Sequence, residues 1–377
     1  MVGITKMKAE KQKAEKEAFF CTTKELSRLG LEQIPTQFQS HKHLIYSSPA
    51  TLAFNSPGAE GFGVKRAGLA VPDSIMLIVA PGCCGRNTSL ISSMKEYNDR
   101  FYYLMMDETD IVTGRHLKKI PKAVEEICNC CEKRPSVVMI CITCVDALLG
   151  TDMERVCRKA EERAGLPVRP CYMYALTREG RKPPMVHVRQ SLYSLLEPKK
   201  KKGNVVNLLG FFSPLIDECE LYDLLHSAGV KTIHEISRCK DYEEYQTMSE
   251  ANFNLVLHPE ARFAAEDFHN RLQIPFIELR RLYQTDKIAS QYQAFGKVLG
   301  VTFSDEVYRE KAEETVAKFK EKRPDASFAI GECMNGDPFE MALAMIKYGF
   351  KVPEIYGTLT AENFIYLNRS EEHTSEL

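Results

Sequence analysis

The sequence predicts an α/β protein built from several doubly wound, Rossmann-like domains with parallel sheets. Short apolar runs bounded by glycine, proline or polar residues alternate with longer helical patterns along most of the chain. These runs are continuously apolar, which is typical of strands covered on both faces of a parallel sheet. A length of 377 residues suffices for two or three such domains.

The expected elements follow one another in this alternating order. The segments with the strand pattern are Ser74–Ala80, Pro135–Ile142, Val168–Tyr174, Asn204–Leu209, Phe253–Leu257, Phe276–Leu279 and Ser327–Ile330. The segments with the helical pattern are Met1–Glu17, His116–Lys133, Asp152–Ala164, Ile216–Ala228, Ala261–Leu272, Asp305–Lys320 and Pro338–Tyr348. The alternation indicates a strand followed by a covering helix, repeated through each domain.

Changes in composition divide the chain into domains. A lysine-rich run at Glu197–Gly203 precedes a fresh strand and is expected to be a solvated linker. The last residues, Arg369–Leu377, resemble a translated sequencing adapter, so we expect a non-native tail and a longer natural protein. The expected parts are a charged extension at 1–40, a first α/β domain at 41–198, the basic linker at 199–203, a second α/β domain at 204–323, a truncated third unit at 324–368 and the tail at 369–377.

Composition and charge exclude several classes of function. A formal net charge of -1 gives no general attraction to nucleic acid or to anionic lipid. No apolar run approaches the length of about 20 residues that a membrane span needs, and the amino terminus lacks a signal-peptide core. We therefore expect a cytoplasmic protein, in which 13 cysteines favour thiolate chemistry over disulfides.

The first candidate site is the loop Ala80–Ser89, which leaves a strand and carries Cys83 and Cys84. Ligands bind at the carboxyl ends of strands in such sheets, so two thiols here are well placed for a function. The loop lacks the glycine spacing and the lysine of a phosphate-binding loop. The alternative is that both thiols are small buried hydrophobic residues.

The second candidate site follows another strand, at Cys141–Cys144. Cys141 lies within the apolar run and is expected in the core, whereas Cys144 stands at the carboxyl edge. Together with Cys128 and Cys131 these residues form two C-x-x-C pairs, which leaves a zinc site open as an alternative. The spacing between the pairs is shorter than in the usual zinc ribbon.

Five segments of the chain resemble motifs of a known family. They are Pro-x-x-Cys-Gly at Pro81–Gly85, Asp110–Ile120, Cys144 followed by Leu-Leu-Gly-Thr-Asp152, Asn204–Gly210 and Arg271–Glu278. They resemble nitrogenase component 1 and its relatives, among them the dark-operative protochlorophyllide reductase and the nickel-tetrapyrrole reductive cyclase of methanogens. The resemblance extends from about residue 40 to about residue 365.

The resemblance implies an iron-sulfur cluster. The family's cluster ligands match Cys84 and Cys144, and Cys83 replaces a family glycine as a further ligand or a bystander. A third family cysteine is missing, because Ser47–Val79 contains none. Two or three thiolates per chain favour a four-iron four-sulfur cluster shared at a subunit interface, in a homodimer or with a related subunit.

The function implied is that of a nitrogenase-like oxidoreductase, although not a true nitrogenase. Pro259 stands where true nitrogenases place the cysteine that holds their iron-molybdenum cofactor. The leading hypothesis is an enzyme subunit that accepts electrons from an ATP-dependent iron protein and reduces an unidentified substrate. The alternative is a non-catalytic scaffold or electron carrier for a metallocluster.

The remaining polar motifs favour structural roles. His116 in a lysine-rich helix start and His187 in a proline-flanked loop belong to no metal-spaced pair, so we expect surface or core histidines. The acidic run Asp107–Asp110 is expected to cap a helix by accepting backbone N–H bonds.

Overall fold

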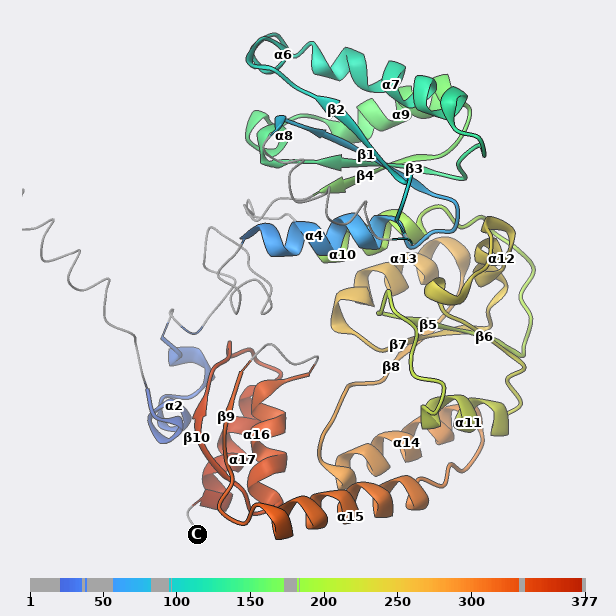
Figure 1. Ribbon diagram of the computed structural model, residues 1–377. Helices are drawn as coiled ribbons and strands as arrows, with labels where there is room; N and C mark the ends of the chain where they lie inside the picture. The colour runs from blue at the N-terminus through green and yellow to red at the C-terminus, as the bar shows by residue number, and fades with distance from the viewer. Residues whose placement is uncertain are drawn as a thin grey trace, which may run out of the picture. The chain divides into compact units, whose positions relative to one another are not determined.

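The computed structural model describes residues 21–35, 38, 57–82, 95, 97–172, 182, 184–331 and 336–374. The chain forms two compact units, shown in Figure 1. The larger unit comprises residues 44–281 and 286–311, and the smaller comprises residues 1–43, 282–285 and 312–377.

The larger unit contains a first sheet with four parallel strands. These are β1 (Ile75–Ala80), β2 (Phe101–Met105), β3 (Val138–Ile142) and β4 (Val168–Tyr172), in the order β2-β1-β3-β4. All five residues of β3 are buried, as expected for a central strand between two helical layers.

Helices cover both faces of this first sheet (Figure 1). Alternate residues of β1 enter two separate cores, one with α7 and α9 and the other with α4 and α10. The helices around the first sheet are α4 (Pro57–Gly68), α6 (Glu108–Thr113), α7 (His116–Cys130), α8 (Cys144–Leu149), α9 (Met153–Ala164) and α10 (Pro184–Tyr193). The first domain is therefore doubly wound, as predicted.

The second sheet repeats this topology further along the chain. Its strands are β5 (Val205–Leu209), β6 (Thr232–His234), β7 (Phe253–Val256) and β8 (Phe276–Glu278), all parallel in the order β6-β5-β7-β8. The surrounding helices are α11 (Glu220–Ser227), α12 (Tyr242–Thr247), α13 (Arg262–Leu272) and α14 (Thr285–Leu299), with short 3-10 turns at Ile236–Arg238 (η4), Met248–Glu250 (η5) and Pro259–Ala261 (η6).

One hydrophobic core joins the two sheets within the larger unit. Val188 and Leu192 of α10 pack in the same cluster as Phe268 and Leu272 of α13. Figure 1 shows these two helices between the sheets. The core therefore fixes how the two sheets are placed within this unit.

The smaller unit is built around two parallel strands, β9 (Ser327–Ile330) and β10 (Lys351–Ile355). Its helices are α2 (Thr23–Leu29), a 3-10 turn at Leu31–Gln33 (η1), α16 (Pro338–Lys347) and α17 (Phe364–Thr374), while the boundary between the units falls within α15 (Glu306–Lys322). Leu26, Phe339 and Leu367 pack in its core. The carboxylate of Glu340 is buried there and accepts hydrogen bonds from the backbone N–H groups of Tyr283 and Gln284.

The strands expected from the sequence are confirmed, with ends that differ by a few residues. Three further strands, β2, β6 and β10, were not predicted. β6 and β10 are partly exposed and lack a continuous apolar run. β2 is apolar throughout, but its side chains alternate between more buried and more exposed positions. The expected helix at Met1–Glu17 lies outside the described residues.

Two local predictions can be compared directly with the structure. Asp107 caps α6 in a capping box with Asp110, which confirms the expected cap. The assignment of His187 to a loop is wrong, because it lies within α10, which begins directly at Pro184.

The domain boundaries at 199–203 and 323 stay predictions. Among the described residues, no helix is both long and apolar enough to cross a membrane.

Candidate functional site

The strands that precede the two predicted thiol segments, β1 and β3, end at the same edge of the first sheet. Strands β1 and β3 are hydrogen-bonded neighbours, with Val79 opposite Ile142. The chain therefore leaves both strands side by side, at Pro81 and at Thr143. Cys144 begins α8 directly after the second exit. Cys83 and Cys84 follow the first exit but lie outside the described residues, so their shared site with Cys144 stays a prediction.

A buried histidine-aspartate pair lies at this edge. Nε2 of His116, on the first turn of α7, is 3.0 Å from Oδ1 of Asp146, on α8, and both side chains are 1% exposed. Nδ1 of His116 is 3.0 Å from the carbonyl oxygen of Asp110. A carbonyl oxygen can only accept, so Nδ1 carries a proton, and the contact with Asp146 must hold a second one. The pair is therefore joined by a hydrogen bond with one proton between Nε2 and Oδ1.

Asp146 also binds the end of its own helix. The hydroxyl of Thr151 donates to Oδ1 of Asp146 over 2.9 Å. The other carboxylate oxygen, Oδ2, is buried and has no hydrogen-bond partner in the described part of the chain, and the same holds for Oγ1 of Thr143. Six buried side-chain polar atoms lack a partner in the described part of the chain, and these two belong to residues on either side of Cys144 in the sequence.

A second acidic group fixes the turn before His116. Asp110 is 1% exposed, and its carboxylate accepts from Nζ of Lys119 and from Nε of Arg115, each over 2.7 Å. These two cations, Lys119 first, lower the pKa of Asp110 to about 2. The backbone carbonyl of Asp110 is thereby held in place to accept from His116.

The carboxyl edge of the second sheet corresponds in topology to that of the first sheet, but different residues lie there. Gly210 follows β5 with φ +142°, and a Cβ there would lie 2.8 Å from the backbone nitrogen of His258, which follows β7. Arg189 donates from Nε and Nη2 to the carbonyl of Gly210, over 3.0 and 2.6 Å. Its Nη1 donates to Glu260 over 2.8 Å. This edge is held together by its own polar groups.

Pro259 occupies the first turn of η6 at this second edge. The preceding His258 caps the turn, with Nδ1 accepting from the backbone N–H of Glu260. The ring of Phe211 contacts His258, and the guanidinium of Arg281 lies 5.3 Å from the centroid of Phe211. Burial lowers the pKa of His258, although Glu260 opposes this effect. Proline contributes no ligand atom at this position.

A family model described as nitrogenase component 1 type oxidoreductase matches residues 60–330, which is more than half of the chain. The chain belongs to this family. Members of the component 1 family carry iron-sulfur clusters.

Several curated relatives of the component 1 family match at low identity. The nitrogenase iron-molybdenum cofactor biosynthesis protein NifE of a Nostoc strain is 26% identical, covering 66% of this chain and 54% of its own length. The protein of the same name from Klebsiella pneumoniae is 24% identical, covering 77% of this chain and 66% of its own. The nitrogenase molybdenum-iron protein alpha chain of Methanosarcina barkeri is also 24% identical, covering 58% and 40%. The chain thus spans about half the length of several of these relatives.

A solved component 1 structure has the same fold. The structure titled "Nitrogenase Cp1 at pH 6.5" matches with a TM-score of 0.60 at 16% identity, covering 83% of this chain and 73% of the other. At this identity the likeness concerns the fold alone. It confirms the predicted class, parallel α/β domains of the component 1 type.

The described thiols do not assemble the alternative zinc site. Cys141 is fully buried in β3 opposite Cys171 of β4, which confirms it as a core residue. Cys131 follows α7, and its sulfur lies 3.2 Å from the hydroxyl of Tyr102, near the start of β2. Within the described ranges, no three histidine, cysteine, aspartate or glutamate side chains are grouped to hold a metal ion.

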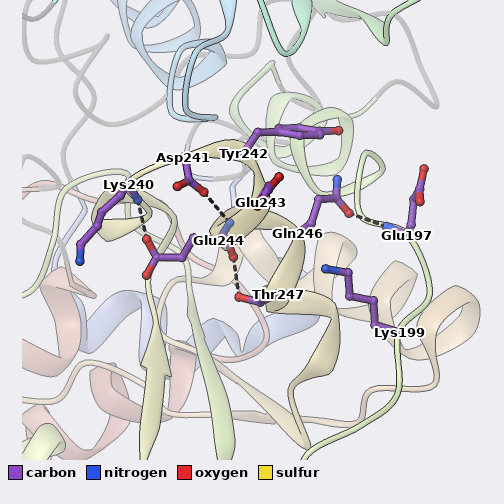
Figure 2. A pocket seen from close by; sticks show the side chains of 9 residues that line it. All are labelled: Glu197, Lys199, Lys240, Asp241, Tyr242, Glu243, Glu244, Gln246 and Thr247. Carbon is purple, nitrogen blue, oxygen red and sulfur yellow. Dashed lines mark hydrogen bonds between the residues drawn. The ribbon is translucent and has the colours of Figure 1, made fainter.

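A separate groove of about 650 Å³ lies along α12. Figure 2 shows its lining side chains, with Asp241 capping the helix and the backbone N–H of Glu197 donating to Gln246. The lining residues are Glu197, Lys199, Lys240, Asp241, Tyr242, Glu243, Glu244, Gln246 and Thr247. They provide charges of both signs but no thiol or imidazole, so the groove offers no soft ligand for iron.

The residues around Cys144 fit an iron-sulfur cluster as the family implies. Cys144 begins a helix at the exit of β3, which adjoins the exit of β1. That Cys84, which follows β1 in the sequence, and Cys144 hold one group together stays a prediction. Two buried polar atoms of residues on either side of Cys144 in the sequence have no partner among the described residues. The network of His116 and Asp146 was not predicted as part of the site, because its members are 30 residues apart.

Proposed function

We propose that this protein is a metallocluster scaffold, a subunit that holds an iron-sulfur cluster for cofactor assembly or storage. The relatives named as iron-molybdenum cofactor biosynthesis proteins carry this proposal, since they recur among the similar proteins from different bacteria. The neighbouring exits of β1 and β3 support it by offering one edge to both cysteine segments. This function was the alternative hypothesis from the sequence.

The ligands we propose are Cys84 and Cys144, with Cys83 as a third. One chain then supplies fewer than the four thiolates that a four-iron four-sulfur cluster takes, so a second copy or a related subunit completes the site. Exposed apolar side chains at the same edge support a subunit contact. They are Met105 at the end of β2, Val112 on α6 and Leu149 on α8. Figure 1 shows α6 and α8 at this edge.

The bound cluster would supply electron transfer and iron coordination, while the protein positions it and shields it from water. Each of the two described acids near Cys144 is already engaged within the protein through at least one carboxylate oxygen. Asp146 holds His116 and Thr151, and Asp110 holds Lys119 and Arg115. A site that holds its acids in internal bonds suits storage better than proton-coupled reduction.

Pro259 further favours a scaffold that releases its cargo. A cofactor anchored by a cysteine at this position would need a thiolate, and the proline has none. The edge around His258 is instead closed by Arg189 and Glu260.

The second candidate is the nitrogenase-like reductase, fed by an ATP-dependent iron protein. Its support is the family description as oxidoreductase and the similarity to the molybdenum-iron protein alpha chain. Both candidate functions require the cluster. A scaffold would pass on iron and sulfide, whereas a reductase would pass on electrons.

Iron content tests the shared part of both candidates. After anaerobic purification, we expect iron and acid-labile sulfide in the parent protein and near-complete loss in Cys84→Ala and in Cys144→Ala. The iron content of Cys83→Ala shows whether Cys83 is a ligand: iron is lost if it is, and kept if it is not. Full iron with unchanged absorption spectra in both Cys84→Ala and Cys144→Ala would refute the cluster assignment.

A transfer assay separates the scaffold from the reductase. Protein loaded with ⁵⁵Fe is mixed with a cofactor-free nitrogenase component 1 and separated by size. A scaffold loses ⁵⁵Fe to the acceptor. A reductase retains ⁵⁵Fe and is reduced by iron protein only when ATP is present, an outcome that would replace the scaffold proposal by the second candidate.

A further inference from the structure

The turn that carries Cys144 has an unusual pattern of hydrogen bonds. Thr143 to Asp146 reads Thr-x-x-Asp, the sequence of a capping box, in which the threonine hydroxyl and the aspartate carboxylate both bond to the first turn of the helix. Here the box does not form. Thr143 Oγ1 has no partner among the described residues, and Asp146 uses Oδ1 for His116 and Thr151. Neither side chain therefore makes its capping-box hydrogen bond at the start of the helix.

His116 holds this turn from a distant part of the chain. Its ring bridges the carbonyl of Asp110, at the α6 segment, and the carboxylate of Asp146, two residues after Cys144. Lys119 and Arg115 in turn fix Asp110. Because the pair is almost fully buried, Asp146 has little freedom, and the start of α8 is anchored through it.

The two atoms without partners, Thr143 Oγ1 and Asp146 Oδ2, differ in whether they can donate a hydrogen bond. A threonine hydroxyl can donate a hydrogen bond, whereas a carboxylate oxygen such as Asp146 Oδ2 can only accept one and carries negative charge. A buried group left unpaired costs free energy, so an open hydroxyl next to a cysteine calls for an acceptor. The sulfur atoms of a bound iron-sulfur cluster would be such acceptors.

We propose that His116, Asp146 and Thr143 are positioning residues for a cluster held at Cys144. The His116–Asp146 pair fixes the turn, the Asp146 carboxylate places negative charge near the site, and the Thr143 hydroxyl offers the cluster a hydrogen-bond donor. This inference rests on the proposed function, because it requires a cluster at Cys144. Hydrogen bonds to the sulfurs and nearby charge set the potential of such a cluster, so these residues tune it.

The proposal predicts shifts of opposite sign in two nearly isosteric variants. Asp146→Asn removes a negative charge and keeps an acceptor for His116, so the reduced, more negative cluster becomes easier to form and the reduction potential rises. Thr143→Val removes the hydroxyl that stabilises the reduced sulfur, so the potential falls. A role limited to folding would not give opposite signs.

A third variant examines the anchoring. His116→Leu removes both donors, and we expect iron to be lost to a chelator at least tenfold faster than from the parent. His116→Gln keeps an amide donor for Asp146 and should recover part of this retention.

The experiment uses the full chain, purified without oxygen. Redox titrations followed by electron paramagnetic resonance give the potential, and iron content and thermal unfolding are measured on the same samples. The matched control is Glu340→Gln, which removes an equally buried carboxylate in the smaller unit. We expect its potential to equal that of the parent.

The outcomes separate the two proposals. A parent protein without iron refutes the proposed function. An iron-loaded parent in which Asp146→Asn and Thr143→Val shift the potential no further than Glu340→Gln, or shift it in the same direction, overturns the positioning role and leaves the cluster assignment standing.

Discussion

The two sheets of the larger unit have the same strand order but differ in how the polar groups at their carboxyl edges are hydrogen-bonded. In each sheet the first strand along the chain lies between the second and the third, so the first and third strands end side by side. At the first edge Thr143 and Asp146, which lie on either side of Cys144 in the sequence, each have a buried polar atom without a partner among the described residues. At the second edge Arg189 bonds to Gly210, Met185 and Glu260 with all its donor nitrogens.

This contrast motivates our proposal that the two edges, which share one topology, have different roles. At the second edge Arg189 satisfies its polar neighbours, whereas at the first edge two buried atoms stay open beside the predicted ligand, and for this reason we propose a bound group there. The sheet topology provides the carboxyl edge, and the side chains that lie there determine whether a ligand can bind.

The largest effect is expected from Arg189→Met at the second edge. The guanidinium is almost fully buried, and its loss leaves the carbonyl of Gly210 and the carboxylate of Glu260 without their donor. We expect a loss of about 3–5 kcal/mol in the free energy of unfolding, measured with urea. Iron content per folded protein should not change.

The control for Arg189→Met is Arg163→Met, which breaks the more exposed ion pair with Glu125 and should cost less than about 1 kcal/mol. Equal costs for the two variants would show that the second edge is not held by its buried pair.

A smaller effect is expected from pH at the end of β4. His187 on α10 contacts the ring of Tyr172, and burial first, then Lys182, lowers its pKa to about 4. The unfolded value is higher, so its contribution to stability is present above about pH 6.5 and is lost as the pH falls toward 4. Metal-free protein should lose about 2–3 kcal/mol over this range.

His187→Phe keeps an aromatic ring against Tyr172 and removes the titration, so its urea unfolding should depend less on pH. The exposed His269 provides the comparison, and His269→Gln should leave the pH dependence of the parent. A parent-like pH profile in His187→Phe would refute the assignment.

Gly210→Ala should have an intermediate effect at the second edge. The new Cβ would lie 2.8 Å from both the backbone nitrogen and Cβ of His258, at a φ of +142° that other residues rarely adopt. We expect a loss of about 2 kcal/mol in urea unfolding. Gly229→Ala shares a positive φ but meets no atom within 4 Å, and should cost about 1 kcal/mol. Equal losses would argue against close packing at Gly210.

The smallest effect is expected from thiols outside the first edge. Cys219 precedes α11, and Cys239 donates to the carbonyl of Glu235. Burial is the main cause that raises the pKa of Cys239 to about 12, so it remains a thiol and is a poor metal ligand. Cys219→Ala and Cys239→Ala should keep parent-like iron content, and a loss of iron in either would place ligands outside the first edge.

Much of the fold could be predicted from local pattern. Strands such as β3 are continuous apolar runs, and Cys141 within it is a core residue as expected. Strand β2 escaped prediction because an edge strand alternates buried and exposed residues, and here aromatic residues fill both kinds of position. Helix α10 escaped because the nearby prolines indicate a loop, although proline also suits a first helical turn.

The candidate site was predicted only in part. The sequence alone places Cys84 and Cys144 after separate strands, and the strand order then makes those strands neighbours. His116 and Asp146 belong to different helices, and no local periodicity links them. The sequence determined the elements, because apolar period and capping chemistry act over a few residues. Only the tertiary structure decided which polar groups meet in the interior, because burial removes water and forces each group to find its partner elsewhere in the chain.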